Sequence, residues 1–333
     1  MRSFARSAML MAALVLTSPS ASFGWGFPGH ETVGAIADII LKRDNPELYE
    51  RIQDILGGKT LREVATYPDC LFVPCPTAPN FTDYAIRNPR HDKYHYTDVP
   101  FQRKRYVALS GGTHRDDVVQ ILRYAAGRLR GSAPADVPAN LEPKEAIWII
   151  AHMVGDIHQP LHVWAMYFDR KCDADADPND FPNLPNFGIG LEVAETHGGG
   201  WFQFPVDRQL HRFWDREAVS RAMQKADVFD GSVEKFALIL ADKPKPPKTL
   251  GHVAGWSRRW ADEIRPLSLA AHQRLTIQRP GNDIKDSHKE VECRWQVQLG
   301  DGYEEWATEK AIEQLTKAGH RLAAMLLEAM DEN

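Results

Sequence analysis

Histidine and aspartate recur together in an apolar stretch near the middle of the chain. The segment AHMVGDIHQPLHV, residues 151–163, carries His152, Asp156, His158 and His162. Residues four apart share one face of a helix, so His152 and Asp156 can reach a single metal ion. A buried carboxylate beside imidazoles is costly unless it is paired or bound to a metal. This stretch alone therefore leaves two alternatives open, a metal site and a hydrogen-bonded pair in the core.

The same four-residue spacing returns at His211 and Asp215, in the segment LHRFWD. Three further candidates lie elsewhere in the chain, namely His30, Asp69 and His95. A hydrogen-bonded core pair could explain one histidine–aspartate pair, but it is a poor explanation for two pairs with the same spacing. Imidazole and carboxylate ligands without cysteine suit zinc in an exported hydrolase. Because these side chains exceed what one ion needs, we predict two or three ions close together.

The elements that must position these residues are mostly predicted to be helices. Apolar residues at helical spacing predict a helix ending near Lys42, and others over 46–56, 114–129, 143–163, 217–227, 233–240, 252–274 and 303–330. The central helix, 143–163, is ended or kinked by Pro160. We predict a short helix around Asp69, loops over 73–90 and 91–101, and a loop or hairpin over 277–302. The expected fold is all-α, a mainly helical single domain with few short strands.

The first 24 residues have the pattern of a secretory signal peptide. Arg2 and Arg6 precede the apolar run AMLMAALVL, and small residues follow up to Gly24. The mature chain is expected to begin at Trp25, in the periplasm or outside the cell. No later stretch is apolar enough to span a membrane. Removing both arginines takes the net charge from -5 to -7, which disfavours tight non-specific duplex binding but not nucleotide chemistry at a metal centre.

The four cysteines of an exported chain favour disulfides. Cys70 and Cys75 are close enough for a small loop bridge, which would leave Cys172 and Cys293 as a long-range pair. The sequence alone leaves all three possible pairings open. The segment 164–196 contains an acidic run, CDADADPND, without the glycine and glutamate that a calcium loop of the EF-hand type needs. We interpret that run as a solvated loop.

Several motifs together resemble one family of enzymes. The matching pieces are WGFPGH at residue 25, YPD around Asp69, HYTD at His95, HMVGDIHQPLH, LHRFWD and AGHRLAAML. They resemble the trinuclear-zinc, single-strand-specific nucleases of fungi and plants, which also have bacterial members. This family shares its fold with the zinc-dependent bacterial phospholipases C. The resemblance spans Trp25 to about Leu326, and implies a zinc-dependent nuclease domain over 25–333.

The resemblance implies three zinc ions with assigned ligands. The first ion is held by Asp69, His95, His152 and Asp156, the second by His162, His211 and Asp215, and the third by His30, Asp156 and the amino group and carbonyl of Trp25. Asp156 would bridge two ions, and Asp69 and Asp156 would be the catalytic residues. The family pattern skips His158, for which a structural or supporting role is expected.

The resemblance also implies the reaction. Water held between two zinc ions would lose its proton and attack phosphorus, leaving 5'-phosphates on single-stranded DNA and RNA. The same site would remove phosphate from 3'-mononucleotides. Tyr96 and Asp98 match positions that stack on a base and bind its edge, and stacking requires an unpaired base. No stable protein partner is expected, and the protein should be a monomer.

The chain departs from the family pattern in three places. The run ETHGGGW has Gly200 where the family usually has asparagine, and 164–196 is a longer insertion near the cleft mouth. Phe72 stands where some members carry a polar or basic residue near the phosphate. Two alternatives remain open: a phospholipase C, although those enzymes use glutamate where Asp215 stands, and a non-catalytic, exported zinc-binding protein.

Overall fold

A computed structural model describes residues 24–76, 78–169, 171–172, 193–195, 202–204, 208–278, 284–286 and 291–331. The α-helices in these ranges are α1 (Gly26–Asp44), α2 (Pro46–Ile55), α3 (Leu61–Val64), α4 (Thr82–Arg87), α5 (Val118–Leu129), α6 (Pro143–Asp156), α8 (Leu210–Arg212), α9 (Ala218–Lys225), α10 (Val233–Ala241), α11 (Trp256–Gln273) and α12 (Tyr303–Ala329). The strands are β1 (Val99–Pro100), β2 (Trp164–Ala165), β3 (Tyr167–Asp169), β4 (Val193–Glu195), β5 (Phe202–Phe204), β6 (Arg208–Gln209), β7 (Leu275–Gln278), β8 (Ile284–Asp286), β9 (Val291–Cys293) and β10 (Trp295–Leu299). The prediction of a mainly helical fold is confirmed.

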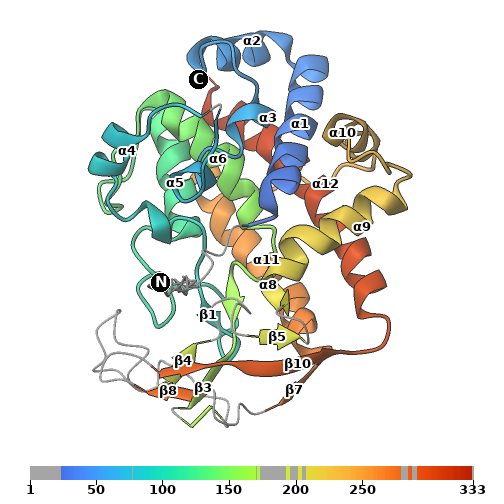
Figure 1. Ribbon diagram of the computed structural model, residues 1–333. Helices are drawn as coiled ribbons and strands as arrows, with labels where there is room; N and C mark the ends of the chain where they lie inside the picture. The colour runs from blue at the N-terminus through green and yellow to red at the C-terminus, as the bar shows by residue number, and fades with distance from the viewer. Residues whose placement is uncertain are drawn as a thin grey trace, which may run out of the picture.

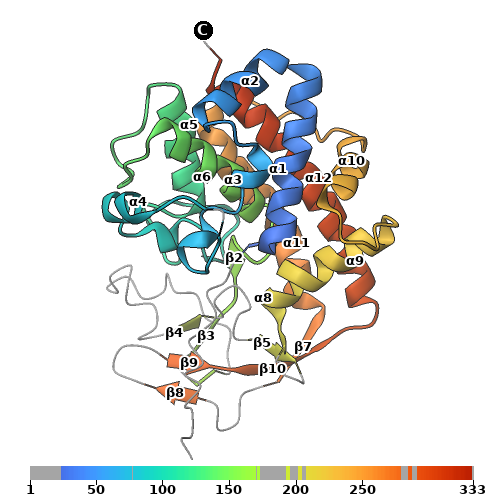
Figure 2. The same cartoon turned by 45° about the horizontal axis from the view of Figure 1, so that its top comes forward.

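The helices gather at one end of the molecule and the strands at the other (Figures 1 and 2). Helix α1 packs on α12, α10 and α3, and α6 packs on α5 and α12. The inner face of α12 is buried at Leu315, Ala318, Leu322 and Leu326, as its apolar spacing predicts. The next residue, Leu327, lies beyond this face and is 45% exposed.

A four-stranded sheet in the order β6-β5-β10-β7 is the largest sheet of the described residues. Strand β10 pairs parallel to β5, with Trp295 opposite Phe202, and antiparallel to β7. The remaining strands form three two-stranded pairs, of which β1-β2 is parallel. The expectation of a loop or a hairpin over 277–302 was therefore too modest, because β7 and β10 belong to a sheet that also includes β5.

Four predictions of secondary structure need correction. The central helix ends at Asp156 rather than near Val163, because the ring of Pro160 would clash with the carbonyl group four residues earlier. Helix α5 begins at Val118 rather than His114, because the carboxylate of Asp117 accepts the N–H groups of the first turn. Helix α4 lies inside the predicted 73–90 loop, and the segment around Asp69 is a short 3₁₀ helix separate from α3.

Two disulfides join Cys70 to Cys75 and Cys172 to Cys293. The pairing that loop length favours is thus the one observed. The first bridge closes a small loop directly after Asp69, and the second ties the segment after β3 to β9. Among the described residues, no helix combines the length and apolar character needed to cross a membrane. Residues 1–23 of the predicted signal peptide and most of the 164–196 insertion lie outside the described residues, and so does Gly200.

Candidate metal centre

The carboxylate of Asp156 is the meeting point of four histidines. Asp156 is fully buried at the C-terminal end of α6. Its Oδ2 lies 3.1 Å from His95 Nδ1 and 3.2 Å from His152 Nε2. Its Oδ1 lies 3.3 Å from His30 Nε2 and 3.7 Å from His162 Nδ1. One side chain therefore gathers imidazoles from α1, α6 and two connecting segments.

Asp69 adds a second carboxylate to the same cluster. Its Oδ1 lies 3.4 Å from His152 Nε2 and 3.8 Å from His95 Nδ1. The ring of His30 stacks on that of His152, with centroids 3.7 Å apart. The 3₁₀ turn that carries Asp69 follows α3, which packs on both α1 and α6. Helix packing thus holds residues 30, 69 and 152 together, although they are far apart in the sequence.

His162, His211 and Asp215 form a neighbouring group. The Nε2 atoms of the two histidines lie 3.0 Å apart, and His211 Nε2 lies 3.5 Å from Asp215 Oδ2. His211 is in α8 and Asp215 is in the π-helical turn Phe213–Glu217 that continues it. The four-residue spacing noticed in the sequence therefore does place both side chains on one face.

The ligand atoms of these residues form three compact groups. The three groups, in each of which all ligand atoms lie within 4.8 Å of one another, are His30, Asp69 and His152; His95, His152 and Asp156; and His162, His211 and Asp215. The last group has the same members as the predicted second zinc site. The other two differ in part from the predicted sets, since Asp69 is grouped with His30 and His152 rather than with His95 and Asp156.

A metal ion fits the chemistry of these residues. The buried polar atoms of the cluster that have no hydrogen-bond partner among the described residues are His30 Nδ1 and Nε2, Asp69 Oδ1 and Oδ2, His95 Nε2, and Asp156 Oδ1. Burying so many polar atoms without partners is costly. Zinc takes imidazole nitrogen and carboxylate oxygen as ligands, so bound zinc would satisfy the carboxylate oxygens and one nitrogen of an imidazole.

Backbone carbonyls orient two of the imidazoles. The Nδ1–H of His152 donates to Ala65 O at 2.6 Å, and that of His162 donates to His95 O at 2.7 Å. Each bond leaves the unprotonated Nε2 facing the cluster, where it can serve as a metal ligand. Histidines that bind metals usually donate their other N–H group in this way.

Gln159 orients one of the carboxylates, and sequence reasoning missed it. The side-chain amide of this buried residue donates to Asp215 Oδ1 at 2.8 Å and accepts the N–H of Leu161. Gln159 lies between Asp156 and His162 in the motif DIHQPLH. Its place between two candidate ligands was the available signal.

Burial and neighbouring charges shift the pKa values of the cluster in both directions. Burial lowers the pKa values of His30 and His162, which favours neutral imidazoles. Burial also tends to lower the pKa of His152, but Asp156 and Asp69 raise it to about 9. Burial opposes ionisation of Asp156, yet the charges of His152 and His162 hold its pKa well below the ordinary value. Burial raises the pKa of Asp215 well above its ordinary value, so a metal ion must displace a proton there.

Trp25 lies directly beside the cluster. Its indole N–H donates to Gly155 O at 3.0 Å, and the side chain is fully buried. Gly155 permits this close approach of α1 and α6, because a methyl group there would lie 2.8 Å from His30 Nδ1. Gly24 fits equally tightly, and a methyl group on it would overlap Asp156 Oδ1. The backbone just before α1 therefore reaches the candidate ligands.

His158 points away from this cluster, as the resemblance implies for a residue that binds no metal. Its Nδ1–H donates to Val154 O at 2.7 Å, and its Nε2 accepts a hydrogen bond from Arg321 at 2.9 Å. Arg321 also pairs with Glu263. His158 thus anchors the turn after α6 to α11 and α12.

The two candidate substrate residues, Tyr96 and Asp98, flank a residue that is hydrogen-bonded to the turn carrying His162. The N–H of Thr97, between them, donates to His162 O at 2.9 Å, and β1 continues this pairing with β2. Asp98 is buried, its N–H donates to Gly112 O, and Tyr167 donates to its carbonyl at 2.7 Å. The segment that would contact a base cannot move independently of His162.

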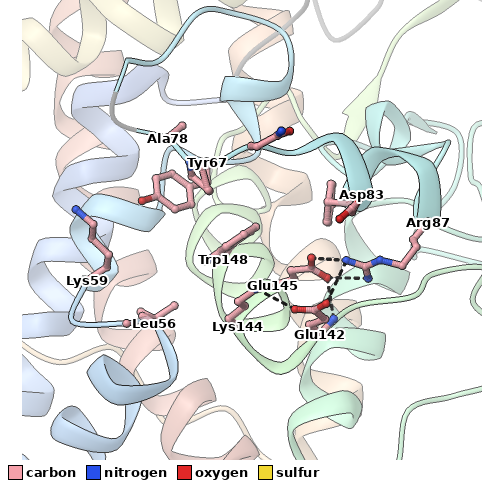
Figure 3. Close-up of a pocket in the computed structure, with 14 residues that line it drawn as sticks. Leu56, Lys59, Tyr67, Ala78, Asp83, Arg87, Glu142, Lys144, Glu145 and Trp148 are labelled. Atoms are coloured by element: carbon pink, nitrogen blue, oxygen red, sulfur yellow. Dashed lines mark hydrogen bonds and ion pairs between the residues drawn. The ribbon is translucent and has the colours of Figure 1, made fainter.

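A separate pocket of about 420 Å³ opens between α2, α4 and the first turns of α6. Tyr67 and Trp148 form its aromatic wall, and Arg87 pairs with Glu145 at its other side (Figure 3). Lys144 pairs with Glu142 at the rim. None of the candidate metal ligands lines this pocket, so it is separate from the histidine cluster.

Comparisons with known proteins relate the chain to nucleases. A family model described as S1/P1 Nuclease matches residues 25–331. Endonuclease 4 of Arabidopsis thaliana is 26% identical over 206 residues, which cover 60% of this chain and 57% of that protein. Nuclease S1 of Aspergillus oryzae is 25% identical over 271 residues, which cover 76% of this chain and 73% of that protein. The match to endonuclease 4 thus spans less than two thirds of its length.

Proposed function

The chain belongs to the S1/P1 nuclease family, and on that premise we propose that it hydrolyses phosphodiester bonds as a single-strand-specific endonuclease of DNA and RNA. The products would carry 5'-phosphates, and 3'-mononucleotides would be further substrates. The observation that carries this proposal is the convergence of buried histidines and aspartates on Asp156, within a chain that matches the family along almost its whole length.

Nine residues would hold three zinc ions. Asp69, His95, His152 and Asp156 would bind the first, His162, His211 and Asp215 the second, and Trp25, His30 and Asp156 the third. Bound zinc would lower the pKa of a water molecule, and its positive charge would stabilise the negative charge that develops on the phosphate. The distances from Asp156 to His30, His95 and His152, between 3.1 and 3.3 Å, support its role as the shared ligand.

The protein groups would place the substrate and keep the site dry. Asp69 and Asp156 are fully buried, so bulk water does not reach their carboxylates. Tyr96 would stack on an unpaired base while Asp98 binds the edge of that base. Because Thr97 is hydrogen-bonded to His162, the base and the phosphate would be held in a fixed relation.

Cleavage of the signal peptide before Trp25 is part of the proposal. The free amino group of Trp25 would be a ligand of the third ion, so the mature protein would be active only after export to the periplasm or the medium. The burial of Trp25 beside Gly155 and the contact of Gly24 with Asp156 support this assignment.

A metal count with product analysis tests the function. We expect about three zinc ions per mature chain, rapid release of 5'-nucleotides from single-stranded DNA and RNA, and slow cleavage of duplex DNA. Phosphate should also be released from 3'-AMP. Release of phosphocholine from lecithin without nuclease activity would instead identify a phospholipase C. A fully zinc-loaded protein that cleaves none of these substrates would indicate a non-catalytic role.

A further inference from the structure

Phe72 exposes an aromatic ring at the edge of the candidate metal centre. Its ring centroid lies 5.6 Å from that of His95, edge to face, and 5.2 Å from that of His91. The side chain is 37% exposed. The phenyl ring therefore contacts a proposed zinc ligand and is also accessible from solvent.

The loop that carries Phe72 is held at both ends. The N–H of Phe72 donates to Asp69 O at 2.9 Å, and Val73 donates to the same carbonyl at 3.2 Å. The Cys70–Cys75 disulfide closes the loop around them. The backbone that carries the ring is therefore constrained, so little backbone entropy is lost when a ligand stacks on the ring.

Tyr96 provides a second aromatic ring next to His95. It is the following residue in the chain, and Lys93 Nζ donates to its hydroxyl at 3.1 Å. The same ammonium group lies 5.7 Å from the centroid of the Tyr96 ring. His95 therefore has two aromatic neighbours: Phe72, whose ring contacts it, and Tyr96, which follows it in the sequence. A strand whose phosphate lies at this histidine has a base on each side of the phosphate to accommodate.

We propose that Phe72 is a second stacking platform, which receives the unpaired base across the cut bond from the base on Tyr96. This inference rests on the proposed nuclease function and adds a substrate preference to it. Phenylalanine carries no charge, so it offers the strand a base contact rather than a phosphate contact. An oligonucleotide has bases for both rings, whereas a 3'-mononucleotide has a base for only one. Phe72 thus favours cleavage within single strands over removal of 3'-phosphates.

Substitution of Phe72 in the zinc-loaded mature enzyme tests the proposal. Phe72→Leu keeps an apolar side chain but removes the aromatic face, so KM for single-stranded DNA should rise by about 5-fold to 150-fold. Zinc content and the kinetics with 3'-AMP should not change. Phe72→Trp should restore or tighten binding of the DNA. Phe229→Leu is the matched control, because Phe229 is 77% exposed and lies far along the chain, just before α10.

A spectroscopic readout separates stacking from a structural role. A phosphorothioate oligonucleotide carrying 2-aminopurine next to the cleavage position should lose fluorescence on binding to the wild-type enzyme and to Phe72→Trp. The quenching should be much weaker with Phe72→Leu. Equal quenching by all three proteins, or parallel losses with DNA and 3'-AMP in Phe72→Leu, would overturn the proposal. A wild-type enzyme that cuts no single strand would overturn the proposed function as well, whereas an active enzyme indifferent to Phe72 would overturn this inference alone.

Discussion

Replacing Asp156 with asparagine tests the arrangement of the whole metal centre. The change keeps the shape of the side chain, but it removes the negative charge. It also replaces one carboxylate oxygen by an amide nitrogen, which binds zinc poorly. Asp156 contacts histidines that we assign to the first and third ions, while the group around His211 and Asp215 has its own carboxylate. We therefore expect zinc content to fall from three ions per chain to about one.

The loss should also appear as lost stability. With free zinc at about 100 times the dissociation constant, each ion that binds only the folded state stabilises it by about 2.7 kcal/mol. Zinc should then stabilise the wild-type protein by about 8 kcal/mol and Asp156→Asn by about 3 kcal/mol. Elemental analysis after gel filtration gives the ion count, and urea unfolding with and without zinc gives the free energies.

Asp38→Asn is a suitable control for the same change at another site. Asp38 accepts the N–H groups of Leu61 and Arg62, at 3.0 and 2.9 Å. These two backbone bonds involve no candidate metal ligand, so all three ions should remain even if the amide weakens one of the bonds. Loss of one ion or none in Asp156→Asn, or an equal loss in Asp38→Asn, would refute the bridging role.

Three further predictions concern single groups. A mature protein with one extra residue before Trp25 should lose one zinc ion, because an amide replaces the free amine; unchanged zinc content and activity would rule out this ligand. Gln159→Leu should weaken zinc binding at the second site by about 10- to 100-fold, because Asp215 loses the bond that orients it; competition with a chelator measures this, and an unaltered affinity contradicts it. His272→Leu should reduce acid sensitivity, because burial lowers the pKa of His272 from 6.5 to about 4 in the folded state. Protonation of His272 leaves the free energy of unfolding unchanged above pH 6.5 and lowers it by about 3 kcal/mol by pH 4. Urea unfolding at both pH values should show a smaller loss of this free energy in the variant than in the wild-type protein. An equal loss in both proteins would count against the reasoning.

Apolar spacing was enough to predict the long helices but not their ends. In α12 the spacing selects a single buried face, so that helix and its core residues could be predicted. After Asp156 the chain still reads as apolar, yet it turns, because Pro160 cannot join a helix that includes the carbonyl of Asp156. The short α4 was missed because flanking proline and asparagine hid a helix of only six residues.

The candidate ligands could be proposed from the sequence because their chemistry is local. His152 and Asp156, like His211 and Asp215, are one helical turn apart, and this spacing is visible in any helix. The residues that orient them could not be found in the same way. The bond from Gln159 to Asp215 crosses 56 positions, and that from Trp25 to Gly155 crosses 130. Such contacts depend on how the helices pack, which local spacing does not encode.

The close fit of Gly24 against Asp156 bears on when the proposed nuclease activity begins. Under the proposed maturation, the precursor still carries a peptide where the third ion must bind, and Gly24 is small enough to lie there without distorting the fold. The precursor would fold with its own block in place, without any separate inhibitor. Messenger RNA in the compartment of synthesis would then be protected by the same peptide bond that is cut on export. Cleavage during secretion would therefore both export the enzyme and activate it.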